Sequence, residues 1–145
     1  MTDYSDIEKK FYCSWKSYMS EEEYLFLLQF IYNLQNNLPN DKICLLVGRS
    51  RTGKTTLIKE MKKIIGEDNF LDNKFLEGQF FFQPKKLAIH ICGINAYSEN
   101  IYMNAIKNFL ISNMSIISDT NTIDNLHPSI LENAYIINMT HDFST

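Results

Sequence analysis

Positions 108–145 contain no lysine or arginine, so a mechanism that needs a fixed cation must take it from earlier in the chain. The basic residues gather instead between positions 42 and 63, where seven of them stand beside a single acid, Glu60. Over all 145 residues, 14 lysines and arginines oppose 17 acids, and the formal net charge is -3. This balance argues against a protein that holds nucleic acid mainly through bulk positive charge.

Cysteine is scarce, and long apolar runs are absent. Cys13, Cys44 and Cys92 are widely spaced, with no CxxC pair or Cys/His cluster, which argues against a disulfide framework or a zinc site. Every apolar run falls far short of the ~20 residues that span a membrane, and no signal-peptide pattern follows Met1. We therefore expect an intracellular protein with reduced thiols and no membrane association. Hydrophobic residues make up 45% of the chain, enough for one folded domain with its own core.

The most specific motif is Gly48-Arg49-Ser50-Arg51-Thr52-Gly53-Lys54-Thr55, which matches GxxxxGK[ST] in full. Its two glycines permit the dihedral angles and the close approach by which backbone N–H groups surround a polyphosphate. Lys54 supplies a positive charge for the β- and γ-phosphates, and the Thr55 hydroxyl can ligate Mg²⁺. A helix that begins here aims the positive end of its dipole at the phosphates.

This motif predicts nucleotide binding, with ATP and Mg²⁺ as cofactors, Lys54 and Thr55 as catalytic residues and Thr55 as the metal ligand. The residues expected to bind the cofactor are Gly48, Arg49, Ser50, Arg51, Thr52, Gly53, Lys54, Thr55 and Thr56. The context agrees, because a buried apolar run at 43–47 precedes the loop and an amphipathic helix is predicted over 54–65.

Strand and helix patterns alternate along the rest of the chain. Further buried strands are predicted at 87–92 and 134–139, a helix at 98–112, and weaker strand signals at 80–82 and 114–117, the latter before a polar turn at 118–125. This alternation predicts an α/β fold, namely the three-layer P-loop NTPase architecture with a central, mostly parallel sheet.

Two helices are predicted before the first strand. Ser5 with Glu8, and Ser20 with Glu23, have the spacing of capping boxes. Apolar residues at helical spacing follow each box: Ile7, Phe11, Trp15 and Tyr18, then Tyr24, Leu27, Leu28, Ile31 and Leu34. We expect residues 1–40 to form a helical lead-in that packs on a nucleotide-binding core at 41–145, and we expect that core to be truncated at its C-terminal end.

A P-loop NTPase normally places an acid at the end of a neighbouring strand, where it holds Mg²⁺ or orients water. The natural strand here, 87–92, ends in Cys92-Gly93-Ile94-Asn95 without a carboxylate, and the next acid is Glu99. The sequence therefore leaves enzymatic activity open: an ATPase or DNA helicase if the site is active.

Three stretches together resemble the superfamily 3 helicase core of DNA viruses, including poxvirus-type and parvovirus-type replication proteins. They are ICLLVGRSRTGKTTLI, KKLAIHICGINAYSENIYMNAIKNFLIS and AYIINMTHDF, and the resemblance covers roughly residues 20–143. It implies a DNA-replication role, a homo-oligomeric ring or a larger replication protein, single-stranded DNA as partner, and a location in the host cytoplasm or nucleus.

The resemblance also implies where the family's functional residues would lie in this chain. The family's paired acids fall on Cys92 and Gly93, and its γ-phosphate-sensing Asn falls on Thr140, or on Asn138 in a shifted register. Its DNA-tracking hairpin corresponds to about 114–127, which lacks lysine and arginine, and its arginine finger would lie later in the chain.

Two other functions fit the same motif. A non-catalytic nucleotide-binding module, acting as a regulatory or assembly subunit, accounts for the missing strand-end acids. A small nucleotide kinase shares the P-loop, but it needs lid arginines, and beyond Lys63 the basic residues are only Lys74, Lys85, Lys86 and Lys107.

Several other residues favour structural roles. His90, between two isoleucines in a predicted strand, is expected to be buried and hydrogen-bonded. Trp15 is expected in the core with Phe11 and Tyr18 rather than as a base-stacking platform. The solvated face of the helix at 54–65 should carry Lys59, Lys62 and Lys63.

Overall fold

The computed structural model describes residues 3–72, 88–91, 115–124 and 126–143. In chain order the elements are α1 (Ser5–Lys10), the 3-10 turn η1 (Trp15–Ser17), α2 (Glu21–Gln35), β1 (Ile43–Val47), α3 (Lys54–Ile65), η2 (Glu67–Asn69), β2 (Phe70–Asp72), β3 (Ala88–Ile91), β4 (Ser115–Thr120), α5 (Pro128–Glu132) and β5 (Ala134–Asn138). The predicted strand at 80–82 and helix at 98–112 lie outside the described residues.

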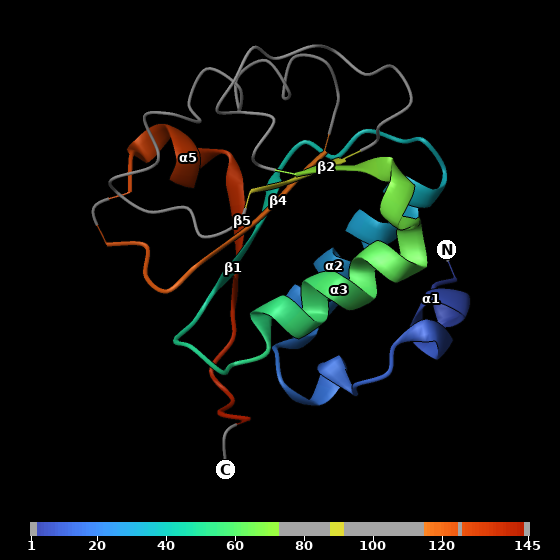
Figure 1. The fold of residues 1–145 in the computed structure, drawn as a ribbon, viewed down its shortest axis with the longest axis horizontal. Coiled ribbons are helices and arrows are strands. Elements are labelled where there is room, and N and C mark those ends of the chain that lie inside the picture. Colours follow the sequence, from blue (N-terminus) through green and yellow to red (C-terminus); the bar gives the residue numbers. More distant parts are fainter. Residues whose placement is uncertain (1–2, 73–87, 92–114, 125, 144–145) are drawn as a thin grey trace.

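The five strands form one sheet in the order β2-β3-β4-β1-β5, and every pairing is parallel (Figure 1). β1 lies between β4 and β5, with Leu46 opposite Asp119 on one side and Ile137 on the other. Parallel strands end at the same edge of a sheet, so the segments that follow β1, β4 and β5 meet there. The predicted α/β fold with a central parallel sheet is confirmed.

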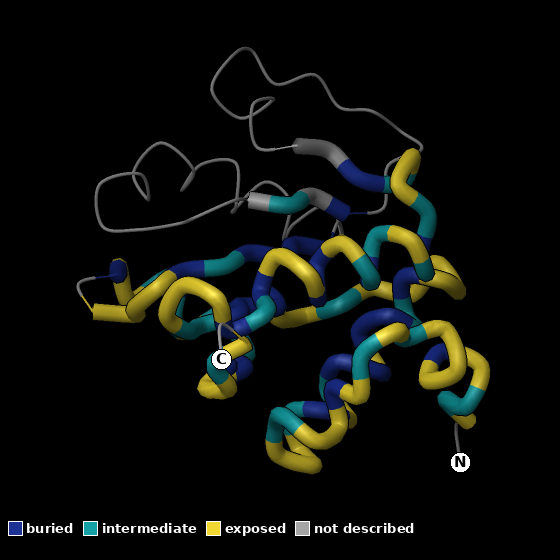
Figure 2. The backbone as a smooth tube through the Cα atoms, turned by 60° about the horizontal axis from the view of Figure 1, so that its bottom comes forward, coloured by how far each residue is buried: buried dark blue, intermediate teal, exposed yellow. Residues whose placement is uncertain are grey.

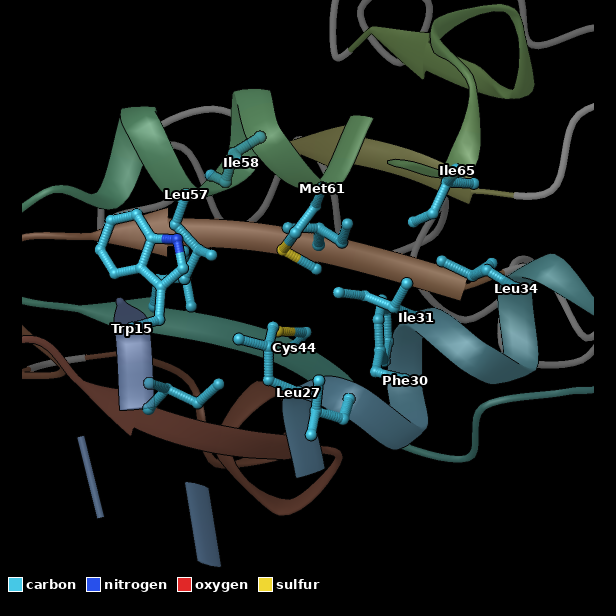
Figure 3. Close-up of a cluster of buried hydrophobic side chains, with 14 of the residues drawn as sticks. Trp15, Leu27, Phe30, Ile31, Leu34, Cys44, Leu57, Ile58, Met61 and Ile65 are labelled. Carbon is cyan, nitrogen blue, oxygen red and sulfur yellow. The ribbon is translucent and has the colours of Figure 1, made fainter. Parts of the chain in front are cut away.

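One face of the sheet is covered by α2 and α3, and the main core lies between them. Figure 3 shows Leu57 and Met61 of α3 pointing toward Cys44 of β1, with Phe30 and Ile31 of α2 beside them. The cluster also includes Trp15 and Ile7, which are 1% and 3% exposed. The lead-in and the sheet therefore share a single hydrophobic core, and burial of Trp15 is confirmed.

Side chains on the other face alternate with those of the main core, as the two-residue period of a strand requires. Ile43, Leu45 and Ile116 are buried but lie outside the cluster beneath α2 and α3. α5 lies on the opposite side of the strands from α3 in Figure 1, and its Ile130 is 1% exposed. The buried stretches of chain therefore run through the middle of the molecule, with exposed turns outside (Figure 2).

The second predicted helix and its capping box are confirmed. The Ser20 hydroxyl accepts a hydrogen bond from the Glu23 N–H at 3.1 Å, and Glu23 Oε1 accepts from the Ser20 N–H at 2.9 Å. The other carboxylate oxygen of Glu23 accepts from the Asn138 N–H at 2.7 Å. One side chain thus caps α2 and joins the start of that helix to the end of β5.

The first predicted helix is shorter than its apolar spacing indicated. It ends at Lys10, its N-cap is Tyr4 rather than a Ser5 capping box, and Trp15 lies in a 3-10 turn. The cause is distant in sequence, because Glu60 of α3 accepts hydrogen bonds from the N–H groups of Tyr12 and Cys13. Those donors cannot also continue a helix.

Several boundaries after α3 differ from the predictions. β4 extends to Thr120, so the polar turn predicted at 118–125 begins three residues later. β4 is also central in the sheet, so residues 115–120 cannot form the projecting DNA-tracking hairpin that the resemblance implied. α5 was not predicted.

Among the described residues, no helix is long and apolar enough to cross a membrane.

Replacing Glu60 tests how the lead-in is held. Glu60→Ala removes the acceptor of the Tyr12 and Cys13 N–H groups and of Trp15 Nε1, and should lower the free energy of unfolding by about 1–3 kcal/mol. Urea unfolding followed by Trp15 fluorescence measures this change. Glu67→Ala, at an exposed position of η2, is the control and should change stability by less than about 0.5 kcal/mol. Equal destabilisation of both variants would contradict the role given to Glu60.

Candidate nucleotide-binding site

The P-loop, residues 48–53, joins β1 to α3 at the edge where the parallel strands end. Both neighbouring strands hold its start: the Gly48 N–H donates to Thr120 O at 3.1 Å, and the Met139 N–H donates to Val47 O at 2.7 Å. At the tip of the loop, the Phe143 N–H donates to Arg51 O at 2.9 Å. The chain segments after β4 and β5 therefore fix the position of the loop.

The backbone of the loop takes the conformations that a phosphate-binding turn requires. Gly53 has φ 91°, and Arg51 has φ 67°, in the left-handed region that non-glycine residues seldom occupy. Thr52 is 2% exposed, and its hydroxyl donates to Arg49 O at 2.8 Å. A buried threonine thus closes the loop on itself and leaves Arg49, Ser50 and Arg51 at the surface.

Lys54 is the charged group at the centre of the site. Its side chain is 7% exposed, and Nζ donates to Gly48 O, to Arg49 O at 2.8 Å and to Asn121 Oδ1 at 3.3 Å. Burial lowers the pKa of Lys54, while the charge of Asp119 acts in the opposite direction. The ammonium is therefore held over the mouth of the loop by carbonyl oxygens, and the charge of the Asp119 carboxylate acts on it.

The N-terminus of α3 differs from that of α2. α2 is capped by a serine side chain, whereas the N-cap of α3 is Gly53 and no side-chain hydrogen bond caps it. The first-turn N–H groups of a helix have no partner within the helix, and together with its dipole they attract an anion. The hydroxyl groups of Thr55 and Thr56 flank this end, and both residues are exposed.

A row of polar side chains runs from Lys62 of α3 through His90 of β3 to Asp119 of β4. Lys62 Nζ lies 3.0 Å from His90 Nδ1, and His90 Nε2 lies 3.5 Å from Asp119 Oδ1. Because an ammonium can only donate, Nδ1 of His90 is the acceptor, and in a neutral ring the proton is on Nε2, facing Asp119. The partly buried, hydrogen-bonded His90 agrees with its predicted structural role, and Lys62 is half-buried rather than fully solvated.

Asn121 and Asp119 were missed at the sequence level. Both lie at the end of β4, in a stretch whose polar composition indicated a turn, and only the strand order brings them beside the P-loop. The resemblance assigned the γ-phosphate-sensing position to Thr140 or Asn138. The structure instead brings Asn121 to Lys54, and Asn138 is exposed at the end of β5.

A cavity of about 510 Å³ adjoins the P-loop on the side of the N-terminal segment. It is lined by Cys13, Trp15, Arg51, Gly53, Thr56 and Phe143. The Trp15 and Phe143 rings meet edge to face, with centroids 6.2 Å apart, and a Cβ on Gly53 would lie only 3.0 Å from Phe143 and 3.1 Å from Trp15, closer than ordinary van der Waals contact. The loop thus has an apolar, aromatic cavity beside its helix end.

All predicted cofactor-binding residues, 48–56, therefore lie in one continuous turn at the sheet edge, and Lys54 and Thr55 begin α3. Cys92 and Gly93, where the family's acids would lie, fall outside the described residues. Within the ranges that the structure describes, no group of three His, Cys, Asp or Glu side chains could hold a metal ion by itself.

Gly48 lies so close to the backbone of Met139, just after β5, that its replacement has a predictable effect. A Cβ at this position would overlap Met139 O and lie 2.7 Å from Thr52 Oγ1, and Met139 cannot retreat without breaking its bond to Val47. Gly48→Ala should therefore lower the free energy of unfolding by about 1–3 kcal/mol. Ser50→Ala, at an exposed loop position, should leave it unchanged in the same urea titration. A Gly48→Ala protein as stable as wild type would show that the loop is not held this tightly.

No protein-family model matches the sequence, and no curated protein matches it. Several solved structures, in contrast, match this chain in fold. The Holliday junction branch migration motor RuvB of Thermotoga maritima superposes with a TM-score of 0.55 at 18% identity, over 88% of this chain and 47% of that one. AMPPCP-bound DnaA from Aquifex aeolicus gives 0.57 at 9% identity, over 83% and 48%.

A putative primosome component from Streptococcus pyogenes serotype M3 gives a TM-score of 0.57 at 11% identity, over 88% of this chain and 86% of that one. The chain spans about half the length of the RuvB and DnaA chains that it matches. At sequence identities of 9% to 18%, the similarity to these structures is a similarity of fold. The chain is similar in fold to AAA+ P-loop ATPases, with an N-terminal helical region and a parallel sheet that carries the P-loop.

Proposed function

We propose that this protein is an ATP-binding P-loop domain. The observation that carries the proposal is the arrangement at the start of α3, where a buried lysine ammonium lies over the loop mouth beside a helix N-terminus without a side-chain cap. Both features supply positive potential at one place, and a polyphosphate is the ligand that uses both. Arg49 and Arg51, exposed on the loop, add to that potential.

The cavity beside Gly53 can accommodate the base of the bound nucleotide. The ring of Phe143, a residue that is 41% exposed, offers a surface on which a nucleobase can stack, with the buried Trp15 packed behind it, and the cavity opens next to Thr56 in the first turn of α3. A nucleotide whose phosphates lie on the P-loop would extend its base toward Phe143. The cavity volume of about 510 Å³ is in the range of small-molecule sites.

The residues present fit a Mg²⁺ ion that arrives with the nucleotide. Mg²⁺ in such sites takes one or two protein ligands and completes its shell with phosphates and water, so a three-residue cluster is unnecessary. The Thr55 hydroxyl, exposed at the first turn of α3, would hold it. When bound, the ion neutralises charge on the β- and γ-phosphates.

Whether the bound ATP is also hydrolysed is a separate question. Cys92 and Gly93 replace the strand-end acids, which favours the non-catalytic regulatory or assembly module as a second candidate. Against this, Asp119 and Asn121 at the end of β4 both act on Lys54, so a carboxylate and an amide do lie on the phosphate side of the sheet. Hydrolysis would depend on these two residues, with Asn121 orienting the γ-phosphate end and Asp119 the water.

A DNA-processing role is the biological context that we propose. RuvB, DnaA and the primosome component share the fold, and the sequence resembles superfamily 3 replication helicases. In that context the chain would work inside cells, in a ring of its own copies or as part of a larger replication protein, with single-stranded DNA nearby.

Lys54→Ala tests nucleotide binding directly. Removing a charged hydrogen-bond donor to phosphate costs about 1.5–3 kcal/mol, so ATP affinity should fall about ten- to a hundredfold. Trp15 is the only tryptophan in the chain and lines the cavity, so its fluorescence should report the titration. Lys42→Gln, at the opposite edge of the sheet, is the control. Equal ATP affinity in Lys54→Ala and wild type would reject the proposal.

A phosphate-release assay on the same samples separates the two candidates. Release that requires Mg²⁺ and disappears in Lys54→Ala and in Asp119→Asn would establish an ATPase. Tight ATP binding without release would establish the non-catalytic module, and Gly93→Glu, which supplies an acid where the family has one, is then the variant expected to gain release. We expect Asp119→Asn to retain ATP binding in either case, because the amide keeps the size of the side chain and Lys54 keeps its hydrogen bond to Arg49 O.

A further inference from the structure

Four aromatic side chains gather where the lead-in meets the segment that follows β5. Trp15 and Tyr18 come from η1 and the residue after it, and His141 and Phe143 come from the chain beyond Asn138. We call these four residues the aromatic cluster. It adjoins the nucleotide cavity, because Trp15 and Phe143 line that cavity as well.

Tyr18 contacts every other member of the aromatic cluster. Its ring centroid lies 4.5 Å from that of His141 and 5.1 Å from that of Phe143. The ring of Trp15 is 6.4 Å away and meets Tyr18 edge to face, as Phe143 does. His141 lies 4.5 Å from Phe143 as well, so it packs against both rings. Edge-to-face and offset pairs at these distances are the favourable arrangements of aromatic rings.

The lead-in itself holds the backbone of Tyr18. The Tyr18 N–H donates to Trp15 O at 2.9 Å, and Ser20 caps α2 two residues later. Glu23, in the first turn of that helix, accepts from the Asn138 N–H, so the lead-in also holds the end of β5. The partly buried Tyr18 ring is therefore a fixed surface beside the path of residues 139–143.

Phe143 needs such a surface because its backbone bond does not fix its side chain. The Phe143 N–H donates to Arg51 O at 2.9 Å, but the residue is 41% exposed. A backbone hydrogen bond leaves the χ angles of a side chain free to change rotamer. The contacts with Tyr18 on one side and Trp15 on the other select the orientation in which the Phe143 ring borders the cavity. A ring that is already oriented need not be ordered by an arriving ligand.

We infer that Tyr18 is a positioning residue for the nucleobase, which it serves by holding the Phe143 ring in the orientation on which the base stacks. Tyr18 is not among the described residues that line the cavity, so it acts through Phe143. The inference rests on the proposed nucleotide site and adds a selectivity to it. Only a ligand with an aromatic base uses the oriented ring, whereas the P-loop alone suffices for a bare polyphosphate chain.

Calorimetric titration of the full chain with ATP and with inorganic tripolyphosphate tests this selectivity. Tyr18→Ala should lower the affinity for ATP about two- to tenfold and leave that for tripolyphosphate unchanged. Tyr18→Phe keeps the ring and should bind both ligands as wild type does. An unchanged ATP affinity in Tyr18→Ala, or an equal fall for both ligands, would overturn the inference.

Tyr32→Ala is the matched control for a general effect on stability. Tyr32 is also partly buried, and it forms an edge-to-face pair with Tyr4 at 5.8 Å on another part of the lead-in. Its removal should leave the ratio of the two affinities at the wild-type value. A ratio that changes as much in Tyr32→Ala as in Tyr18→Ala would show a structural role only.

A double-mutant cycle tests whether Tyr18 acts through Phe143. Phe143→Ala removes the stacking ring, so nothing remains for Tyr18 to position. Tyr18→Ala/Phe143→Ala should therefore lose no more ATP affinity than Phe143→Ala does alone. Losses that multiply in the double variant would overturn the coupling.

Hydrogen exchange of the Phe143 amide measures the positioning without nucleotide. Because two ring contacts are lost, Tyr18→Ala should speed this exchange about five- to a hundredfold, and Tyr32→Ala should leave it unchanged. Unchanged exchange in Tyr18→Ala would overturn the positioning role whether or not ATP binds. Faster exchange in a protein whose wild type binds no ATP would reject the proposed nucleotide site, and the base with it, while the restraint on Phe143 would stand.

Discussion

The carboxylate of Glu60 is the constraint on which the functional surface depends. It accepts hydrogen bonds from two backbone N–H groups and from the Trp15 indole, all on a segment more than 40 residues earlier in the sequence. Charge-assisted bonds of this kind are stronger than neutral ones. Because Glu60 lies on the helix that begins at the P-loop, these bonds place Trp15 against Gly53 and leave the ring of Tyr12 in solvent.

The P-loop itself is held from three sides rather than by its own residues alone. Gly48 is bonded to the end of β4, Arg51 to Phe143, and Lys54 to Asn121. The buried hydroxyl of Thr52 adds a bond inside the loop. A loop fixed in this way loses less conformational freedom when a ligand arrives, so the backbone is prepared for a phosphate before one is present.

Patterns confined to a few neighbouring residues predicted the structure well. The P-loop, the Ser20 capping box and the strands predicted at 43–47 and 134–139 depend on local spacing and apolar periodicity, and all are present, the last of them ending one residue earlier at Asn138. Features set by distant partners were not predictable. Glu60 ends the first helix, and the place of β4 between β1 and β3 brings Asp119 and Asn121 to Lys54. Neither effect leaves a signal in the sequence around those residues.

The strand order has a consequence for synthesis on the ribosome. β1 is paired on both sides with strands that come late in the chain, β4 from Ser115 and β5 up to Asn138. At translation rates of about 5–20 residues per second, roughly 5–20 s separate the synthesis of the P-loop strand from that of its last partner. Until β4 is made, β1 has neither neighbour, so the nascent chain must shelter this apolar strand by the packing of α2 and α3 alone.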